Sequence, residues 1–595
     1  MFTATGSCLE EPPTVRLAIL IPRERVGISR RRCKTGGTEG PGNTRIRYVD
    51  FHDAATLPQH PNIGLGLALV VFMKSFALGL IVGLVLAAPL VSILFLLHAT
   101  VGTPFIPFDL FDGLVRILPG TLITFGIDMM VRLLMFLRLN LSDSSKIAEQ
   151  IQAIAIFLSI SVLGVGIFFA ALKNRNSRSI VPLGLVLGIG TAIPVAIVAG
   201  SPVWTVVALT AWGVAVSAVR YRVALSPDLT ASAAPELATP TPTLDAVDRR
   251  RFLINLGGTT ASITVVGAVV AAALHTSSEP VVHATSEVPL PDRSGDVEPA
   301  PGTRPEYTPV ADHYRIDIDL RPMKIEEDTW RLPITGMVDH PLNLTLGDFR
   351  NFDEQQHLFV TLSCISNPLG GDLIGTTRWS GVSVRRVLRD AGINERAQFL
   401  KLTAADGFYE TVPTDLIHSD ERVMFTYLWD GKPLTMEHGF PLRIYIPDRY
   451  GMKQPKWIVR AELIEKDQPG YWVVRGWDKT ARMKATSIID TVAVRSMIQK
   501  DGRTLVPVGG IAHAGARGIS RVEVQVDENA WMPATLRTPL SGLTWVLWRY
   551  DWPFQPGRHV FRVRCYDGAG VAQIEVLQEP HPSGASGIYS VRRSL

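Results

Sequence analysis

LSCISNPLGGDLIGTTRWSGV, residues 362–382, is the stretch that decides how the second half of this chain folds. It predicts a strand that ends in Cys364, followed by a turn containing Asn-Pro and Gly-Gly. The glycines leave bare backbone beside the thiol, where a large ligand could approach the main chain closely. A lone cysteine is more often a small buried apolar residue than a ligand. A thiolate at such a turn would suit a soft metal.

A second polar group follows further along the chain, in EHGFPLR (437–443) and YGMKQPKW (450–457). One histidine and several cations near a strand end suit an anionic ligand such as a phosphate. Each cation alone would more often be a solvated surface charge. The prediction of an anion site therefore depends on their occurring together.

The sequence around these motifs predicts two soluble domains. Short β-like runs at 330–336, 399–403 and 442–447 alternate with a helical segment at 382–391, which indicates an α+β domain over 310–484. From 485 to 595, alternating strands recur between turn residues, as in an all-β immunoglobulin-like sandwich.

Together these motifs resemble the sulfite oxidase family of molybdopterin-dependent oxidoreductases. The resemblance rests on C-x-x-N-x-x-G-G-D-L-I-G-x-x-R-W-x-G-V, then E-H-G-F-P-L-R and G-x-x-x-x-K-W, and it includes that family's immunoglobulin-like dimerisation domain. It implies a mononuclear molybdenum–molybdopterin cofactor, oxygen-atom transfer, and electrons exchanged one at a time with a separate carrier, a cytochrome or a quinone. It also implies a possible homodimer.

The resemblance assigns a role in the site to individual residues of this chain. Cys364 matches the thiolate that ligates molybdenum, and Trp477 stands where the sulfite oxidisers have an active-site tyrosine. His313 and Arg315 fall where the family has an F-x-x-R-x-H element, which this chain lacks. The full set of cofactor-binding candidates is Asn367, Arg378, Asp406, His438, Arg443, Gln454, Lys456, His313 and Arg315.

The expected substrate is a small molecule other than sulfite. Enzymes of the family that oxidise sulfite bring arginines to the anion, one of them just after the C-x-x-N, where this chain has Pro368 and Leu369. A site without that clamp should bind sulfite poorly, which favours a neutral S-oxide or N-oxide. Sulfite oxidation itself, or a cofactor-free binding module on a membrane anchor, are the alternatives.

The first half is a multi-span membrane domain over 62–222. A span needs about 20 mainly apolar residues, and 75–98, 149–172, 180–199 and 202–219 meet this requirement, with a further span inside 249–275. Residues 111–137 contain Arg116, Asp128 and Arg132, so we interpret them as interfacial or re-entrant.

The basic loops orient these spans. Lys173–Arg178, Arg220–Arg222 and Arg249–Arg251 should all be cytoplasmic, which places the catalytic domain outside the cytoplasm of a cell membrane. Arg249-Arg-Arg-Phe-Leu253 resembles a twin-arginine export signal, although a basic flank that only sets topology has the same composition.

The rest of the chain is connecting sequence. Residues 1–60 read as a disordered basic tail, 223–248 as a linker, and 276–309 as a proline-rich linker of extended, unpacked chain.

The net charge of +4 gives no argument for nucleic acid as a partner. The four cysteines form no C-x-x-C or C-x-x-C-H, so we expect no haem or iron–sulfur cluster in this chain.

Overall fold

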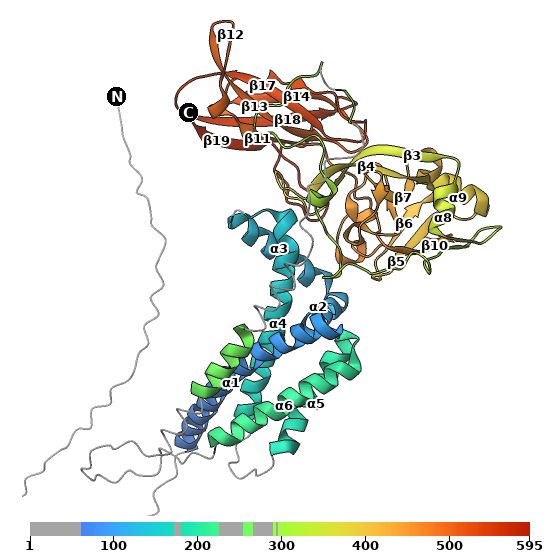
Figure 1. Ribbon diagram of the computed structural model, residues 1–595. Helices are drawn as coiled ribbons and strands as arrows, with labels where there is room; N and C mark the ends of the chain where they lie inside the picture. Colours follow the sequence, from blue (N-terminus) through green and yellow to red (C-terminus); the bar gives the residue numbers. More distant parts are fainter. Residues whose placement is uncertain (1–60, 138, 172–179, 225–253, 266–289, 293–294) are drawn as a thin grey trace, which may run out of the picture. The chain divides into compact units, whose positions relative to one another are not determined.

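The computed structural model describes residues 61–137, 139–171, 180–224, 254–265, 290–292 and 295–595 (Figure 1). The expected tail at 1–60, the linker at 223–248 and the twin-arginine-like motif lie almost wholly outside these residues. Of the predicted last span, only a helix over 254–265 is described.

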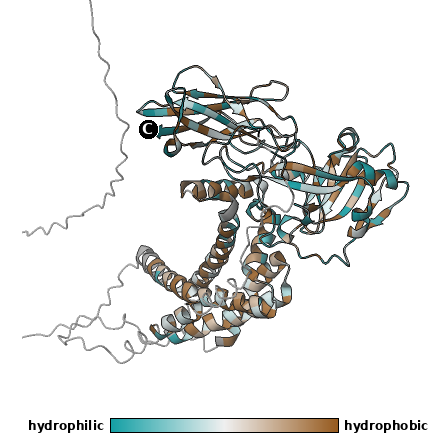
Figure 2. Cartoon of the chain, turned by 45° about the horizontal axis from the view of Figure 1, so that its top comes forward, coloured by the Kyte–Doolittle hydropathy of each residue, from teal (hydrophilic) through white to brown (hydrophobic). Residues whose placement is uncertain are grey.

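The apolar half is helical, as predicted. Four helices are long and apolar enough to cross a membrane, through the stretches Phe72–Val101, Ser144–Ala171, Val181–Ala199 and Pro202–Arg222. Figure 2 shows these helices as mainly hydrophobic, whereas the strands mix both kinds of residue. The helices themselves are α1 (Pro61–Val101), α4 (Leu141–Ala171), α5 (Ile180–Ala199) and α6 (Pro202–Ala224).

The charged segment 111–137 forms two shorter helices that Pro119 separates. Helix α2 runs over Ile106–Ile117 and α3 over Gly120–Phe136. Neither helix is among the four that are long and apolar enough to cross a membrane, and the interfacial or re-entrant interpretation of this segment stays a prediction. Helix α2 packs closely on α5, because an added Cβ at Gly113 would overlap the backbone of Val198.

The α+β domain contains two sheets. The first has the strand order β2-β1-β10-β5-β6, with β1 and β10 parallel; the second has the order β3-β4-β7-β8, with β9 paired to β7. The strands are β1 (Leu332–Gly336), β2 (Leu342–Leu344), β3 (Gln355–Ser363), β4 (Ile374–Ser383), β5 (Phe399–Ala404), β6 (Tyr409–Pro413), β7 (Met424–Trp429), β8 (Lys432–Pro433), β9 (Arg443–Tyr445) and β10 (Ile458–Ile464).

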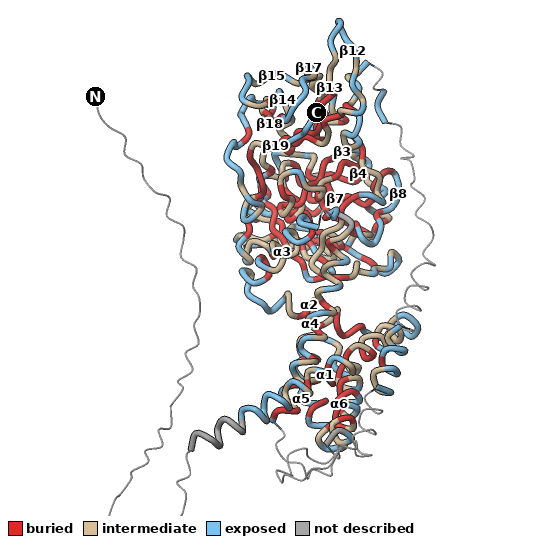
Figure 3. Tube along the Cα trace, turned by 90° about the vertical axis from the view of Figure 1, so that its left-hand side faces the viewer, coloured by how far each residue is buried: buried red, intermediate tan, exposed pale blue. Residues whose placement is uncertain are grey.

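Helices α8 (Leu346–Asn351), α9 (Val384–Ala391) and α10 (Thr414–Ser419) complete this domain. Helix α9 begins two residues later than predicted, and it buries Val384, Val387, Leu388 and Ala391 on one face. That spacing is the helical period that identified it in the sequence. Figure 3 shows the buried residues gathered along β4 and β7.

The C-terminal domain is a two-sheet sandwich, so the predicted fold class is confirmed. One sheet has the order β11-β13-β17-β16 with β12 at its side, and the other has β15-β14-β18-β19. Trp548, Phe561 and Cys565 are buried in its core. The strands are β11 (Thr486–Val492), β12 (Ile498–Lys500), β13 (Arg503–His513), β14 (Ile519–Val526), β15 (Met532–Pro533), β16 (Thr535–Leu536), β17 (Val546–Pro553), β18 (Arg558–Asp567) and β19 (Tyr589–Ser594).

The expectation of an unpacked linker up to residue 309 is wrong for residues 295–309. Ala300 is buried, and Arg304 pairs with Asp490 of β11 at 2.8 Å. The carbonyl of Pro301 accepts a hydrogen bond from Thr491 at 3.0 Å. Proline removes donors but leaves carbonyl acceptors, so this extended segment can still bind along the sandwich.

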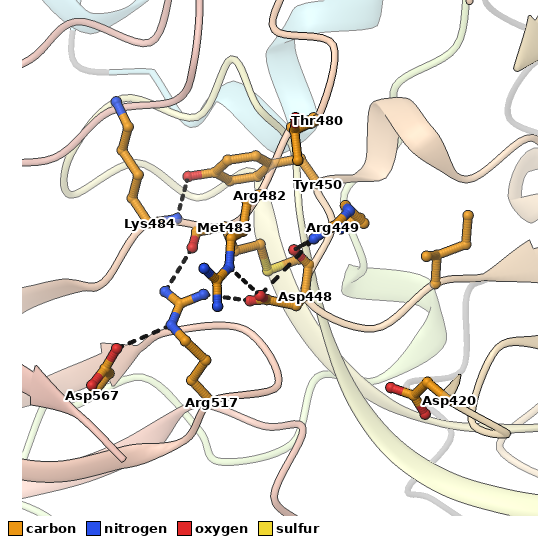
Figure 4. Close-up of polar contacts among 12 residues, drawn as sticks. Asp420, Asp448, Arg449, Tyr450, Thr480, Arg482, Met483, Lys484, Arg517 and Asp567 are labelled. Atoms are coloured by element: carbon orange, nitrogen blue, oxygen red, sulfur yellow. Dashed lines mark hydrogen bonds and ion pairs between the residues drawn. The ribbon is translucent and has the colours of Figure 1, made fainter. Parts of the chain in front are cut away.

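A cluster of ion pairs joins the α+β domain to the sandwich (Figure 4). The Arg517 guanidinium contacts Asp448 at 2.6 Å and Asp567 at 3.1 Å, and it donates to the carbonyl of Met483 at 2.8 Å. Arg482 also pairs with Asp448, at 2.6 Å. Asp448 directly precedes the loop that carries Gln454 and Lys456, so this cluster positions that loop.

We expect Arg517→Met to lower the free energy of unfolding by about 2 kcal/mol, because it removes the cation that Asp448 and the buried Asp567 share. Thermal unfolding of the detergent-solubilised chain measures the effect. Arg521→Met is the control, since Arg521 is largely exposed and its pair with Glu523 is a surface ion pair. Equal losses in both variants would contradict a special role for Arg517.

Candidate functional site

One cavity of about 260 Å³ collects most of the side chains that the sequence singled out. It lies against the ends of β3, β7 and β9 on one side and against α2, α3 and α4 on the other. The candidate residues on its lining are Cys364, Asp406, His438, Arg443, Gln454, Lys456 and Trp477.

Cys364 directly follows β3, at the turn that the sequence predicted. Its thiol is buried, and Sγ lies 3.0 Å from the hydroxyl of Ser366. Burial raises the pKa of the Cys364 thiol, and the Ser366 hydrogen bond opposes this rise. The buried sulfur faces the cavity, where it could ligate a metal.

Arg443 is a buried cation between two tryptophans. Its guanidinium carbon lies 4.6 Å from the ring centroid of Trp379 and 5.0 Å from that of Trp429. Nη1 donates to the carbonyl of His438 at 3.1 Å, whereas Nε has no partner among the described residues. Burial lowers the pKa of Arg443 to about 9, so an anion in the cavity would stabilise its charge.

His438 and His313 lie beside this arginine as neutral rings. Their centroids are 5.6 Å apart, and each packs against Trp429. Burial lowers the pKa of His438 well below its ordinary value and that of His313 to about 4. His438 lines the cavity, whereas His313 lies behind its wall.

Lys456 and Asp317 join the cavity wall to the helical domain. Lys456 Nζ lies 3.0 Å from the Asp317 carboxylate, which also accepts from Lys146 of α4 at 2.8 Å. Burial opposes ionisation of Asp317, but Lys456, Lys146 and Arg315 overcome it and hold its pKa well below the ordinary value. For Lys456, burial has a larger effect than the nearby Asp317 carboxylate, and it lowers the pKa of the lysine to about 8.

Helix α2 contacts the same segment. Arg116 pairs with Asp319 at 2.9 Å, and Asp109 pairs with Arg321. The Asp112 carboxylate accepts the backbone N–H of Leu320 at 3.2 Å. These contacts hold residues 315–321 between the cavity described above and the helical domain.

The remaining lining candidates come from separate loops. The Gln454 side-chain amide donates to the carbonyl of Arg449 at 2.8 Å, and its Oε1 has no partner among the described residues. Trp477 is buried against Ile365, and its indole N–H is likewise unpartnered. Burial raises the pKa of Asp406 to about 6, while the N–H of Phe408 opposes this rise.

Four candidates do not line this cavity: His313, described above, and Asn367, Arg378 and Arg315. Asn367 accepts the N–H of Leu373 at 3.0 Å and so shapes the turn after Cys364. Arg378 lies outside the lining residues, within β4. Arg315 pairs with Asp317 at 2.8 Å, which makes it a support for the lysine pair.

The sequence analysis missed Asp317 and Lys146 as members of the site. Asp317 is two residues from the candidate Arg315, and Lys146 is a charge at the start of an apolar helix, which is a signal for a functional residue. It also missed the helical wall of the cavity, for which no motif exists.

Asp317→Asn is expected to lower the free energy of unfolding by about 3 kcal/mol, because it leaves Lys456 buried without a carboxylate and Lys146 with Glu149 alone. Thermal unfolding in detergent measures this loss. Glu326→Gln is the control, as its pair with Lys324 is surface-exposed and 3.7 Å long. A melting temperature unchanged from the wild type would contradict a stabilising role for the ion pairs of Asp317 with Lys146 and Lys456.

The residues present suit a molybdenum–molybdopterin cofactor. A buried thiol provides a soft metal ligand. Arg443 has no carboxylate partner within the described part of the chain, and unpartnered polar atoms of Arg443, Gln454 and Trp477 belong to lining residues. Buried polar groups are normally satisfied, so these atoms indicate a polar, anionic ligand.

Comparisons with known proteins agree. The model of the oxidoreductase molybdopterin binding domain matches residues 319–472. The uncharacterized oxidoreductase YuiH of Bacillus subtilis is 31% identical over 148 residues, which cover 25% of this chain and 72% of that protein. Mitochondrial sulfite oxidase of Homo sapiens is 26% identical over 290 residues, covering 40% of this chain and 52% of that protein. This chain belongs to the sulfite oxidase family of molybdopterin-dependent oxidoreductases.

Membership in the sulfite oxidase family confirms the expected molybdenum–molybdopterin cofactor. This chain spans about half the length of the mammalian sulfite oxidases that it matches. Among solved structures, the sulfane dehydrogenase SoxCD of Paracoccus pantotrophus aligns over 48% of this chain and 80% of its own, at 19% identity and a TM-score of 0.42. The family assignment rests on the sequence matches.

Proposed function

We propose that this protein is a membrane-anchored oxidoreductase that transfers an oxygen atom to or from a small S-oxide or N-oxide outside the cytoplasm. The observation that carries the proposal is the single cavity that unites the Cys364 thiol with the uncompensated Arg443 guanidinium. Sulfite oxidation and a cofactor-free binding module are the alternatives.

Each lining residue has a task in this proposal. Cys364 ligates the metal as a thiolate, and Arg443, His438, Gln454 and Lys456 hold the pterin and its phosphate. The bound cofactor supplies the two-electron oxygen-atom chemistry. In the reductive direction an S-oxide loses its oxygen as water, which consumes two protons and two electrons from a separate carrier.

A neutral substrate is favoured over sulfite. The cations that line the cavity are Arg443 and Lys456, and the cofactor would occupy both. Pro368 and Leu369, at the position of the sulfite-binding arginine, line a separate cavity of about 40 Å³. An anion without a cationic partner is costly to bury.

The proposed location follows from the first half of the chain, and the proposed partners follow from the family resemblance. Four helices can span a membrane, and the basic loops support an exterior catalytic domain. The electron carrier is a cytochrome or a quinone, and the sandwich supports a homodimer by its resemblance to the family's dimerisation domain.

Metal analysis of the full chain from a host that makes the cofactor tests the proposal. We expect about one molybdenum per chain, reduction of methyl sulfoxides by a reduced dye, and little sulfite oxidation. Sulfite turnover above sulfoxide turnover would support the first alternative. Folded protein without molybdenum or pterin would support the binding module.

Cofactor retention should fall as the pH rises above about 8. Lys456 loses its proton near that pH in the cofactor-free protein, whereas a bound phosphate raises its pKa, so binding takes up a proton. The affinity should then fall by up to about tenfold per pH unit. Pterin fluorescence released on dialysis between pH 7 and 10 measures the loss, and Lys456→Arg should flatten the curve.

A further inference from the structure

The cavity has two chemically different walls. The wall from the α+β domain carries Cys364, Arg443 and Lys456, whereas the wall from α2, α3 and α4 is mainly apolar. The apolar residues on the helical wall are Phe111, Leu114, Val115, Leu118, Leu122, Ile123, Ile127, Met130, Val131, Leu141 and Ile156. A cofactor held by the polar wall leaves this second wall without an assigned ligand.

The helical wall continues to the outer surface of α3. Leu122 lines the cavity and is still 55% exposed. Phe125, Met129 and Leu133, further along α3, are also exposed. A run of large apolar side chains of this kind marks a membrane or ligand surface, so α3 offers an apolar path into the cavity.

The charges that face this path disfavour anions. Asp406 and Glu149 line the cavity, and Glu149 is paired with Lys146 at 2.8 Å. Ser145 adds a buried hydroxyl that has no partner among the described residues. The wall therefore suits an uncharged molecule with an apolar body and one polar group.

Apolar residues of the α+β domain continue the apolar lining to the end of the cavity that contains Cys364. Ile365, Met452 and Trp477 line it beside Cys364, where an oxygen-atom substrate would approach the metal. A molecule lying along α3 could therefore place its polar end at Cys364.

We propose that the helical wall is the binding and entry site for an uncharged, lipid-soluble substrate, an S-oxide with an alkyl chain, which reaches the catalytic cavity from the membrane along α3. This inference rests on the proposed oxygen-atom transfer. It gives the membrane helices a part in substrate selection beyond anchoring.

Gly126 allows a sharp test. It lies on the helical wall, and a Cβ added there meets no atom within 4 Å. A phenylalanine at this position would begin in open space and place its ring on the helical wall. Gly164 of α4 is the matched control, because its added Cβ is equally free and it lies outside the cavity lining.

The kinetic arm uses methyl n-alkyl sulfoxides of one to eight carbons with the holoenzyme in nanodiscs. We expect kcat/KM to rise about fourfold for each added methylene until the path is filled, as burial of a methylene group predicts. In Gly126→Phe the ratio of kcat/KM between hexyl and methyl substrates should fall at least about tenfold, whereas Gly164→Phe should keep the ratio. A ratio near one in the wild type would overturn the proposal.

The second part of the experiment measures substrate binding in the absence of turnover. An alkyl sulfoxide carrying a diazirine is photolysed with the full chain, and labelled peptides are identified by mass spectrometry. Labels on α3 and α4 that Gly126→Phe removes and Gly164→Phe retains support the proposal. Labels elsewhere, or labels unchanged in Gly126→Phe, overturn it. Missing molybdenum would contradict the proposed function while leaving this arm readable.

Discussion

Replacing Cys364 with serine is expected to abolish oxygen-atom transfer while the protein remains folded. Cys364 is buried at the cavity, and serine fits the same space. A serine hydroxyl is a poor ligand for a soft metal, since it does not ionise as a thiol does. Groups that merely support metal ligands are worth about 10- to 100-fold, so we expect a loss of more than about a hundredfold.

The measurement separates ligation from folding. Molybdenum content, the electronic spectrum of the metal centre and sulfoxide turnover are compared in Cys364→Ser and the wild type. Cys565→Ser is the control, because Cys565 is also buried but lies in the sandwich core. Unchanged turnover per molybdenum in Cys364→Ser would show that the thiol is only a packed core residue.

Arg443→Met is expected to remove cofactor binding and to make the cofactor-free protein no less stable. Arg443 is buried between Trp379 and Trp429, and its lowered pKa shows that burial of its charge is unfavourable without an anion. Methionine keeps apolar packing and removes the buried charge. Truncating one partner of a buried charge pair costs about 3 kcal/mol, or more than about a hundredfold in Kd.

Pterin fluorescence and molybdenum content after gel filtration measure retention, and the melting temperature of cofactor-free protein measures stability. Arg537→Met is the control, because Arg537 is largely enclosed but has its own carboxylate, Glu306, at 3.2 Å. It should lose stability and keep the cofactor. Full retention of cofactor by Arg443→Met would contradict a phosphate-binding role.

Local patterns in the sequence predicted much of the fold. The apolar runs matched the four helices that are long and apolar enough to cross a membrane, because helix length and hydropathy follow directly from the sequence. The alternating strands predicted between 485 and 595 include β14, and the helical segment predicted at 382–391 became α9. The proline content of 295–309 led to the wrong prediction of an unpacked linker. Prolines do not prevent the backbone carbonyls of such a segment from accepting hydrogen bonds.

The sequence by itself determined the family and the cofactor, and it predicted which residues would hold that cofactor, because Cys364, His438, Arg443 and Lys456 stand in motifs of fixed spacing. Only the tertiary structure decided which of them face one cavity: it placed Trp477 on the lining and left Asn367 and Arg378 off it. It alone paired Lys146 with Asp317 and made α3 a wall of the site. Contacts between residues far apart in the chain depend on how whole elements pack, which no local pattern of residues encodes.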